Sequence, residues 1–332
     1  MDILALSWLL IVAFGVIMYV VLDGFGLGIG LISPFFKNQH DKDLIVSTIL
    51  PVWDGNETWL VFIGATLYGG FPLAFSIILP AMYMPIMLMV VGLLLRGASF
   101  EFRLKSNRTK FVWNVAFFLG SLITTAMQGI IIAGLLVGFE MPDKFTSFTT
   151  HQWFSPFSLF CAFCLIIGYG LLGSNRLIIK TSGKIQDKCY QISKVLQIIS
   201  LISVGILMLW TMQIDRSIMH TWLHSNHSPI FLGLAISGGM LFVMHYISLT
   251  RCHENAPYWI LIIMFLIAYI GLLLTIFPYI ILHKLTYMEA AASDSALKFM
   301  LVGAIIVVPI LLYYSYYSYK IFSGKTHEKI GY

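Results

Sequence analysis

The chain alternates between long apolar segments and short polar connections. An α-helix needs about 20 mostly apolar residues to cross the hydrocarbon core of a bilayer. Nine segments satisfy this requirement: residues 4–34, 52–71, 75–95, 111–139, 154–178, 192–214, 230–249, 258–282 and 299–322. Only the short stretch Phe71-Pro72-Leu73 separates the second segment from the third. The pattern therefore predicts an all-α integral membrane protein with about nine transmembrane helices.

Basic residues collect in alternate connections, which predicts the orientation of the chain. With the amino terminus outside, sixteen of the 20 lysines and arginines fall on the inner side, and the other four are Lys144, Arg216, Lys284 and Lys298. Cytoplasmic loops carry such an excess, so we expect the amino terminus out and the carboxyl terminus in. The chain begins Met-Asp-Ile-Leu, without the basic region of a cleaved signal peptide, so the first span is expected to be retained.

The composition agrees with residence in a bilayer. Of the 332 residues, 59% are hydrophobic and 11% are charged, whereas a soluble domain has about 25% charged residues. The mean hydropathy is +0.88. A water-soluble enzyme is thereby excluded, and we expect residues 1–332 to form a single polytopic membrane domain. The net charge of +5 follows from the inner-loop excess and gives no reason to expect a nucleic-acid partner.

One ionisable residue lies within the first apolar segment. Such a side chain in a membrane helix costs about 2.5–3.5 kcal/mol, so it is a candidate for function. Asp23 lies in the inner half of the segment, beside the alternating glycines Gly24, Gly26, Gly28 and Gly30. Small residues at this spacing let another helix approach closely, so the glycines predict a packing seam. For Asp23, a hydrogen bond to a neighbouring helix and a role in proton movement both stay open.

A second polar cluster marks the inner start of the second segment. Asp54 and Glu57 are three residues apart and share one helix face with Thr58. Two close carboxylates in a low-dielectric setting repel each other, which favours a proton on one of them, as a proton relay requires. The alternative is an ordinary acidic helix start. Trp53 and Trp59 flank the cluster and favour the membrane interface, so we interpret it as a functional site.

A third cluster follows the third segment on the same side. Arg96 and Glu101 are candidates to pair with the carboxylates of the second cluster, whereas Arg103 is better explained as an inner-side anchor. All three clusters converge on the inner face, as a proton entrance from the cytoplasm requires. Together they supply five candidates for a proton path: Asp54, Glu57, Asp23, Glu101 and Arg96.

The histidines do not form a recognisable set of haem ligands. Proteins hold haem iron through His, Met, Cys or Tyr, and among nine histidines only His245 lies well within an apolar segment. A lone intramembrane histidine is more often a hydrogen-bonded packing residue. We therefore expect no cofactor, no metal and no catalytic residue on this chain.

Several of these stretches resemble subunit II of the cytochrome bd-type quinol oxidases, which are bacterial terminal oxidases. The resemblance covers essentially the whole chain. It includes LDGF with its glycines, PVWDGNETWLV, LLLRGASFEFR, FLGSL followed by QG, GYGLLG, LIIKTSG and VVPILLYYSYYSYKIFSGK. The combination of WDGNE-WL and RG-SFEFR in this order is far more specific than any single motif.

The resemblance implies a fold, a location and partners. It implies two helix bundles plus a peripheral helix in the bacterial inner membrane, packed against a homologous haem-carrying subunit I and a small single-span accessory subunit. Such complexes oxidise quinol near the outer face and reduce dioxygen to water, and their two haems b and haem d belong to subunit I. Asp54 occupies the motif position associated with proton supply, and Glu57 occupies a position that varies between Glu and Gln.

Two positions depart from the family pattern. Many members read DGFD where this chain reads DGFG, so Gly26 replaces a second acid, and Asn114 stands where several relatives carry Asp. A proton route through either of those carboxylates cannot operate unchanged here. Either Asp23 and Asp54 suffice, with waters, or the route runs through another subunit.

We therefore expect the haem-free second subunit of an electrogenic quinol oxidase, not catalytic alone, which supports assembly of the haem subunit and proton delivery from the cytoplasm. Two alternatives remain. A proton-coupled secondary transporter would use the same buried acids and glycine-broken helices, and a purely structural membrane partner would use them as helix anchors. The resemblance, and not the hydrophobic pattern, favours the oxidase.

Overall fold

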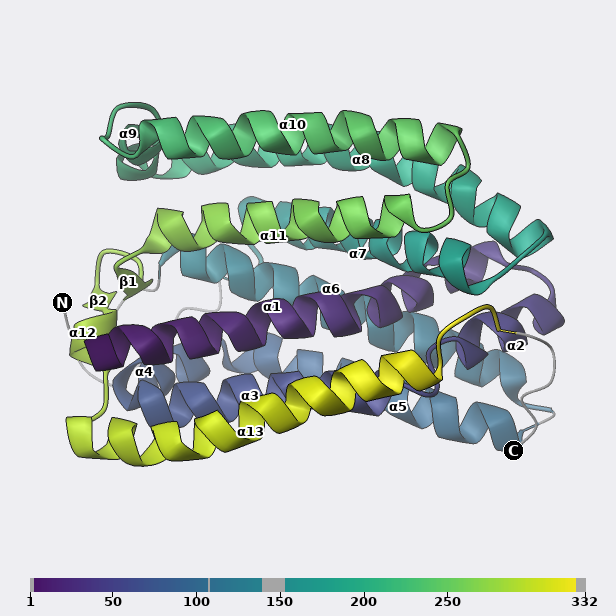
Figure 1. The fold of residues 1–332 in the computed structure, drawn as a ribbon, viewed down its shortest axis with the longest axis horizontal. Coiled ribbons are helices and arrows are strands. Elements are labelled where there is room, and N and C mark those ends of the chain that lie inside the picture. Colours follow the sequence, from purple (N-terminus) through teal and green to yellow (C-terminus); the bar gives the residue numbers. More distant parts are fainter. Residues whose placement is uncertain (1–2, 107, 139–152, 327–332) are drawn as a thin grey trace.

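The computed structural model describes residues 3–106, 108–138 and 153–326. Over these ranges the chain folds into helices and one two-stranded antiparallel sheet (Figure 1). The helices are α1 (Ile3–Ile32), the 3-10 turn η1 (Ser33–Phe35), α2 (Gln39–Ser47), α3 (Trp53–Gly70), α4 (Pro72–Ala81), α5 (Tyr83–Lys105), α6 (Lys110–Val137), α7 (Pro156–Lys180), α8 (Lys184–Ile214), α9 (Arg216–Leu223), α10 (Ser228–Thr250), α11 (Ala256–Ile276), α12 (Tyr287–Ala290) and α13 (Asp294–Ile321). The strands are β1 (Tyr279–Ile281) and β2 (Leu285–Thr286).

The predicted all-α membrane architecture is confirmed. Within the described ranges, eight helices are long and apolar enough to cross a membrane: α1, α5, α6, α7, α8, α10, α11 and α13. The remaining expected span, over residues 52–71, corresponds to α3, which has 18 residues and is about 27 Å long at 1.5 Å per residue. Its first turns carry Asp54, Asn56 and Glu57, which lower its hydropathy below that of the other eight.

The predicted bounds of the third span are wrong. Instead of one helix over residues 75–95, the structure has the short helix α4, a break at Met82 and then α5. Pro80 and Pro85 flank the break, and because a proline ring removes a backbone donor and clashes with the preceding turn, the chain is interrupted there. The spanning helix therefore begins at Tyr83, and Arg96 lies well inside α5 rather than past its end.

The eighth predicted span is also too long. Instead of continuing to residue 282, α11 ends at Ile276, and the chain then forms the β1–β2 hairpin, in which Tyr279 pairs with Thr286.

In the short helix α12, hydrogen bonds from the backbone amide and hydroxyl of Thr286 hold the pKa of Glu289 below its usual value. This capping box fixes the start of α12 beside the hairpin.

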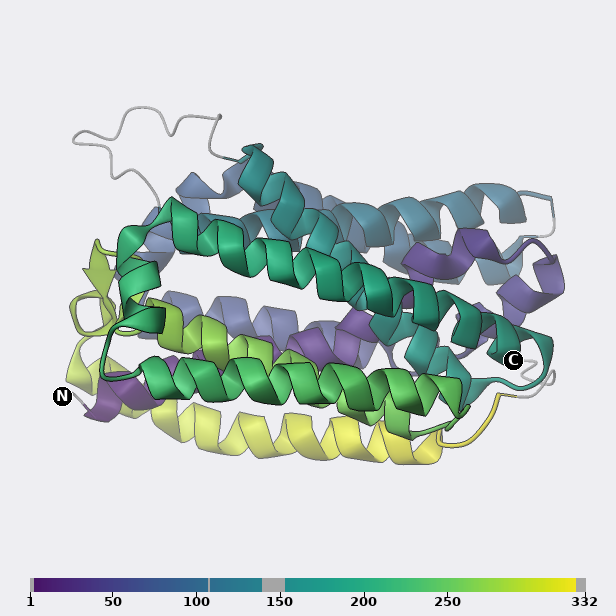
Figure 2. The same ribbon diagram turned by 90° about the horizontal axis from the view of Figure 1, so that it is seen from above.

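The membrane-length helices lie side by side in two groups (Figures 1 and 2). Helices α1, α3, α5 and α6 form one group, and α7, α8, α10 and α11 form the other. The groups meet where α1 and α6 contact α7, and α13 lies at the periphery against α3.

The start of α1 and the end of α13 lie at opposite ends of the molecule, as an odd number of crossings requires. We call the end that carries α2 and the α7–α8 and α10–α11 connections the basic end, because it includes Lys37, Lys184 and Arg251.

The glycines of α1 do not all make the same contact. A Cβ atom at Gly28 would lie 1.7 Å from the carbonyl oxygen of Tyr169 in α7, and one at Gly173 would lie 2.4 Å from the backbone of Gly28. At Gly30 a Cβ would lie 2.0 Å from the Ser121 hydroxyl of α6. A Cβ at Gly24 would lie 3.0 Å from the ring of Tyr169, and one at Gly26 would meet nothing nearer than 3.5 Å. Backbone contact between α1 and α7 therefore depends on Gly28 and Gly173.

We expect Gly28→Ala to lower the thermal stability of the detergent-purified protein, because the added methyl group forces α1 away from α7. Overpacking of this kind costs about 1–3 kcal/mol. The matched control is Gly26→Ala on the same helix, where the methyl group has room and the gain in helix propensity is about 0.5–1 kcal/mol. Equal unfolding temperatures for the two variants would contradict the proposed contact.

Candidate functional site

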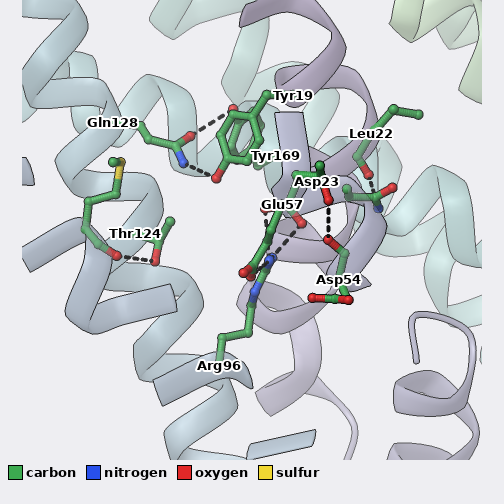
Figure 3. A network of polar contacts seen from close by, with 12 residues as sticks. Tyr19, Leu22, Asp23, Asp54, Glu57, Arg96, Thr124, Gln128 and Tyr169 are labelled. Atoms are coloured by element: carbon green, nitrogen blue, oxygen red, sulfur yellow. Dashed lines mark hydrogen bonds and ion pairs between the residues drawn. The ribbon is translucent and has the colours of Figure 1, made fainter. Parts of the chain in front are cut away.

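Three ionisable side chains from three different helices meet in the interior of the first group (Figure 3). The Nη2 atom of Arg96 in α5 donates hydrogen bonds to Asp23 Oδ1 and Oδ2 in α1, at 2.8 and 2.9 Å, and to Glu57 Oε1 in α3, at 2.5 Å. The side chains of Asp23 and Arg96 are 0% exposed, and that of Glu57 is 23% exposed. We call Asp23, Glu57 and Arg96 the ion triad.

The depth of Arg96 depends on a second pair of glycines. A Cβ atom at Gly92 of α5 would lie 2.5 Å from the Thr124 hydroxyl, and one at Gly120 of α6 would lie 2.8 Å from the backbone nitrogen of Arg96. Because neither glycine has a side chain, α5 and α6 pack backbone to backbone. This close contact sets the position of the Arg96 backbone in the helix group.

The guanidinium of Arg96 uses only one of its three nitrogens within the triad. Its Nε and Nη1 atoms are buried and have no hydrogen-bond partner among the residues that the structure describes. A Cβ atom at Gly26 would lie 3.7 Å from this Nη1 and 3.5 Å from Asp23 Oδ1. The position of Gly26, at which the family resemblance implies a second acid, therefore lies directly beside the triad, and in this chain it provides no carboxylate.

Three hydrogen-bonded, uncharged polar side chains lie about one helical turn further from the basic end than the ion triad. Gln128 Nε2 donates to the Tyr19 hydroxyl at 2.9 Å, and the Tyr169 hydroxyl donates to Gln128 Oε1 at 3.0 Å. Tyr19 precedes Asp23 by one turn of α1. Reasoning from sequence missed these residues, because tyrosine and glutamine in an apolar segment carry no charge signal. Two motifs of the family resemblance include two of them: FLGSL–QG contains Gln128, and GYGLLG contains Tyr169.

Other predicted candidates do not join the triad. The side chains of Asp54 and Glu101 are exposed, and neither forms an ion pair within the described ranges. Figure 3 shows the Asp54 carboxylate turned away from Arg96, with only its backbone oxygen accepting a hydrogen bond, from Thr58 at 3.3 Å. Asp54 and Glu57 therefore begin one helix together but face different surroundings.

Arg103 does more than anchor the chain at the inner surface, contrary to the interpretation from sequence. Its side chain is only 3% exposed, and its Nη2 donates to Asp43 at 2.6 Å while its Nε donates to Asn114 at 2.7 Å. Asn114 in turn donates to Gln39 at 3.1 Å. The second departure from the family pattern, Asn114, thus participates in a polar cluster at the basic end.

The start of α3 is held by its own polar contacts. The buried amide of Asn56 donates to the carbonyl of Leu22 at 2.7 Å and accepts from the Tyr319 hydroxyl of α13 at 3.1 Å. Trp59 is fully buried, and its Nε1 donates to Ser315 at 3.4 Å. These contacts hold the first turns of α3 against α1 and α13, and they hold Glu57 beside Arg96.

The chain matches one family over nearly its full length. The profile of the family described as cytochrome bd terminal oxidase subunit II covers residues 4–322. The chain is 24% identical over 369 aligned residues to cytochrome bd-I ubiquinol oxidase subunit 2 of Escherichia coli, with 99% of this chain and 97% of that protein covered.

It is 22% identical to cytochrome bd ubiquinol oxidase subunit 2 of Bacillus subtilis, with 97% and 96% covered. In fold it is similar to a chain of the bd oxidase structure from Geobacillus thermodenitrificans, with a TM-score of 0.79, 17% identity, and 96% of this chain and 98% of that one covered. The chain therefore belongs to the cytochrome bd terminal oxidase subunit II family and is a multi-pass membrane subunit of a bacterial respiratory oxidase.

Proposed function

We propose that this chain is the haem-free second subunit of its oxidase, that it supports assembly of the haem-carrying subunit, and that it delivers protons from the basic end. The observation that carries the proposal is the ion triad, which joins a partly exposed carboxylate to a fully buried one through a single guanidinium nitrogen. The named relatives are subunits of ubiquinol oxidases, which supports a quinol as the electron donor of this complex.

The charge balance of the triad supports a role in proton transfer. Two carboxylates and one guanidinium carry a net negative charge, and an uncompensated charge in a protein interior costs several kcal/mol. Binding of one proton removes that charge. Glu57 is 23% exposed and Asp23 is 0% exposed, so Glu57 is the member that exchanges protons with the basic end. Asp23 is the member that holds a proton in the interior.

The uncharged chain of Tyr19, Gln128 and Tyr169 extends the polar contacts away from the basic end. Tyr19 is four residues before Asp23, about 6 Å along α1, and its hydroxyl is connected through Gln128 to Tyr169 in the second group of helices. We propose that a proton leaves Asp23 along these three hydrogen-bonded side chains, toward the second group of helices.

Two described histidines in or beside the apolar segments, His245 and His283, have polar partners at Nε2, which supports a haem-free subunit. The Nε2 of His245 lies 2.6 Å from the amide of Asn175, and the Nε2 of His283 lies 2.7 Å from Asp215. In this proposal the two haems b and the haem d belong to the partner subunit I, which would supply the redox chemistry of dioxygen reduction, and no step on this chain involves them.

Purification from the native membrane tests the proposal as a whole. We expect a haem-carrying subunit to co-purify with this chain and to show a reduced-minus-oxidised spectrum of haem d. A colourless protein that alone moves a solute with protons across a vesicle membrane would instead identify a transporter.

The family pattern allows Gln at position 57, but this chain has Gly26 where that pattern has a second acid. We therefore expect Glu57→Gln to slow quinol-dependent oxygen consumption by tenfold or more here, while the haem content of the complex stays normal. The amide keeps the size of the side chain but cannot carry a transferable proton, and a positioned acid–base group contributes about 10²–10⁴-fold. We also expect Asp54→Asn, one turn closer to solvent, to slow quinol-dependent oxygen consumption.

The matched control for both variants is Asp187→Asn, an exposed acid in the first turn of α8 at the same end of the molecule. Its turnover should equal that of the wild type. Normal turnover of Glu57→Gln in an intact complex would contradict proton delivery, and loss of haem from it would favour a purely structural role.

We expect Arg96→Leu to prevent assembly, because it leaves Asp23 and Glu57 buried without a cation. Breaking a buried pair in this way costs about 3–5 kcal/mol. The absorbance of haem d per milligram of membrane protein measures the result. The double variant Asp23→Asn/Arg96→Gln removes one charge of each sign and should regain assembled complex but not turnover. Recovery of both would identify the triad as a helix anchor only.

A further inference from the structure

Helix α10 contacts the rest of the second group of helices through few buried side chains. Its buried residues are His245, Ser248 and Leu249, and two of these three are polar. Between helices in a bilayer there is little hydrophobic driving force, so packing and hydrogen bonds decide where a helix sits. The polar contacts of α10 therefore bear directly on its attachment.

His245 joins a hydrogen-bonded cluster that involves three helices. Its Nε2 lies 2.6 Å from the amide nitrogen of Asn175 in α7. The Ser193 hydroxyl of α8 donates to Asn175 Oδ1 at 2.8 Å and lies 2.7 Å from the Ser174 hydroxyl. These contacts engage only one of the two ring nitrogens of His245.

Three buried polar atoms beside this cluster have no partner among the described residues. They are His245 Nδ1, Gln197 Oε1 and Ser248 Oγ, on side chains that are 0%, 3% and 4% exposed. The Nδ1 atom is a donor in one tautomer of the ring and an acceptor in the other, so it needs a partner in both. More than 90% of buried polar groups in proteins have one, and three exceptions in one place are unusual.

The three atoms belong to one stretch between α8 and α10. His245 and Ser248 are three residues apart on the same face of α10, about 4.5 Å along its axis. Gln197 of α8 donates its Nε2 to the carbonyl of Phe242 at 3.3 Å, and Phe242 lies three residues before His245. The amide of Gln197 therefore faces α10 within one turn of the histidine.

We propose that these three atoms form a binding site for one ordered water molecule, which bridges His245 Nδ1, Gln197 Oε1 and Ser248 Oγ and fixes α10 to α8. A buried water typically makes about three hydrogen bonds, which is the number of atoms available. The three groups are an imidazole nitrogen, an amide oxygen and a hydroxyl, so they suit a small neutral ligand. The site lies on α8 and α10, apart from the ion triad, and does not depend on proton delivery.

A cryo-EM map of the complex, at a resolution that shows ordered water, tests the site directly. We expect a density peak within about 3.2 Å of His245 Nδ1 and of both other atoms. A map that shows the three side chains in direct contact with one another, with no density peak between them, would overturn the proposal. So would a peak that contacts only one of them.

The sign of a stability change provides an independent test. If the Ser248 hydroxyl binds the bridging water, Ser248→Ala should lower the unfolding temperature of the complex, by about 2 °C. If the hydroxyl is unbonded, its removal should leave that temperature unchanged or raise it, because a buried unpaired polar atom is unfavourable. Either of these results would overturn the proposal.

The matched control is Ser237→Ala on the same helix. Its hydroxyl donates to the carbonyl of Leu234 in its own helix, at 3.0 Å, and so holds no second helix. We expect this variant to unfold at the wild-type temperature, and a loss as large as that of Ser248→Ala would contradict the bridging role.

Discussion

The fully buried guanidinium of Arg96 depends on carboxylates from two other helices. The side chain of Arg96 is fully buried, and the desolvation of each ion costs several kcal/mol. Two other helices supply the compensation, α1 through Asp23 and α3 through Glu57. Because the hydrogen bonds have to form at the same depth, the three helices cannot slide along one another without breaking them. The ion triad therefore fixes the relative depth of α1, α3 and α5, in addition to the close packing of α5 on α6 at Gly92 and Gly120.

The number and order of the spans could be predicted because long apolar segments are a property of composition, which needs no neighbour to be recognised. The predicted ends of two spans were wrong, because local backbone chemistry there outweighs the average hydropathy of the window. A hydropathy window passes smoothly over Pro80 and Pro85, although the chain breaks at Met82 between them. It also passes over Ile276, after which the apolar residues continue in a hairpin rather than in a helix.

The site could be predicted only in part, for a different reason. Charged residues in apolar segments stand out, so Asp23, Glu57 and Arg96 were all recognised. Helical spacing states which residues share a face, but it does not state how that face is rotated toward other helices. For this reason Asp54, three residues from Glu57 and the stronger candidate from sequence, is exposed, whereas Glu57 reaches Arg96. The uncharged partner Gln128 could be identified only after α6 and α1 had been placed together.

The shortness of α3 has a consequence for the lipid around it. After the polar first turns, only residues 59–70 are apolar, which is about 18 Å of helix, against a hydrocarbon thickness of about 30 Å. A hydrophobic mismatch of this size is relieved by local thinning of the bilayer or by protein that replaces lipid. We therefore expect headgroups and bulk solvent on the basic side to reach inward along α3, toward the level at which Glu57 meets Arg96.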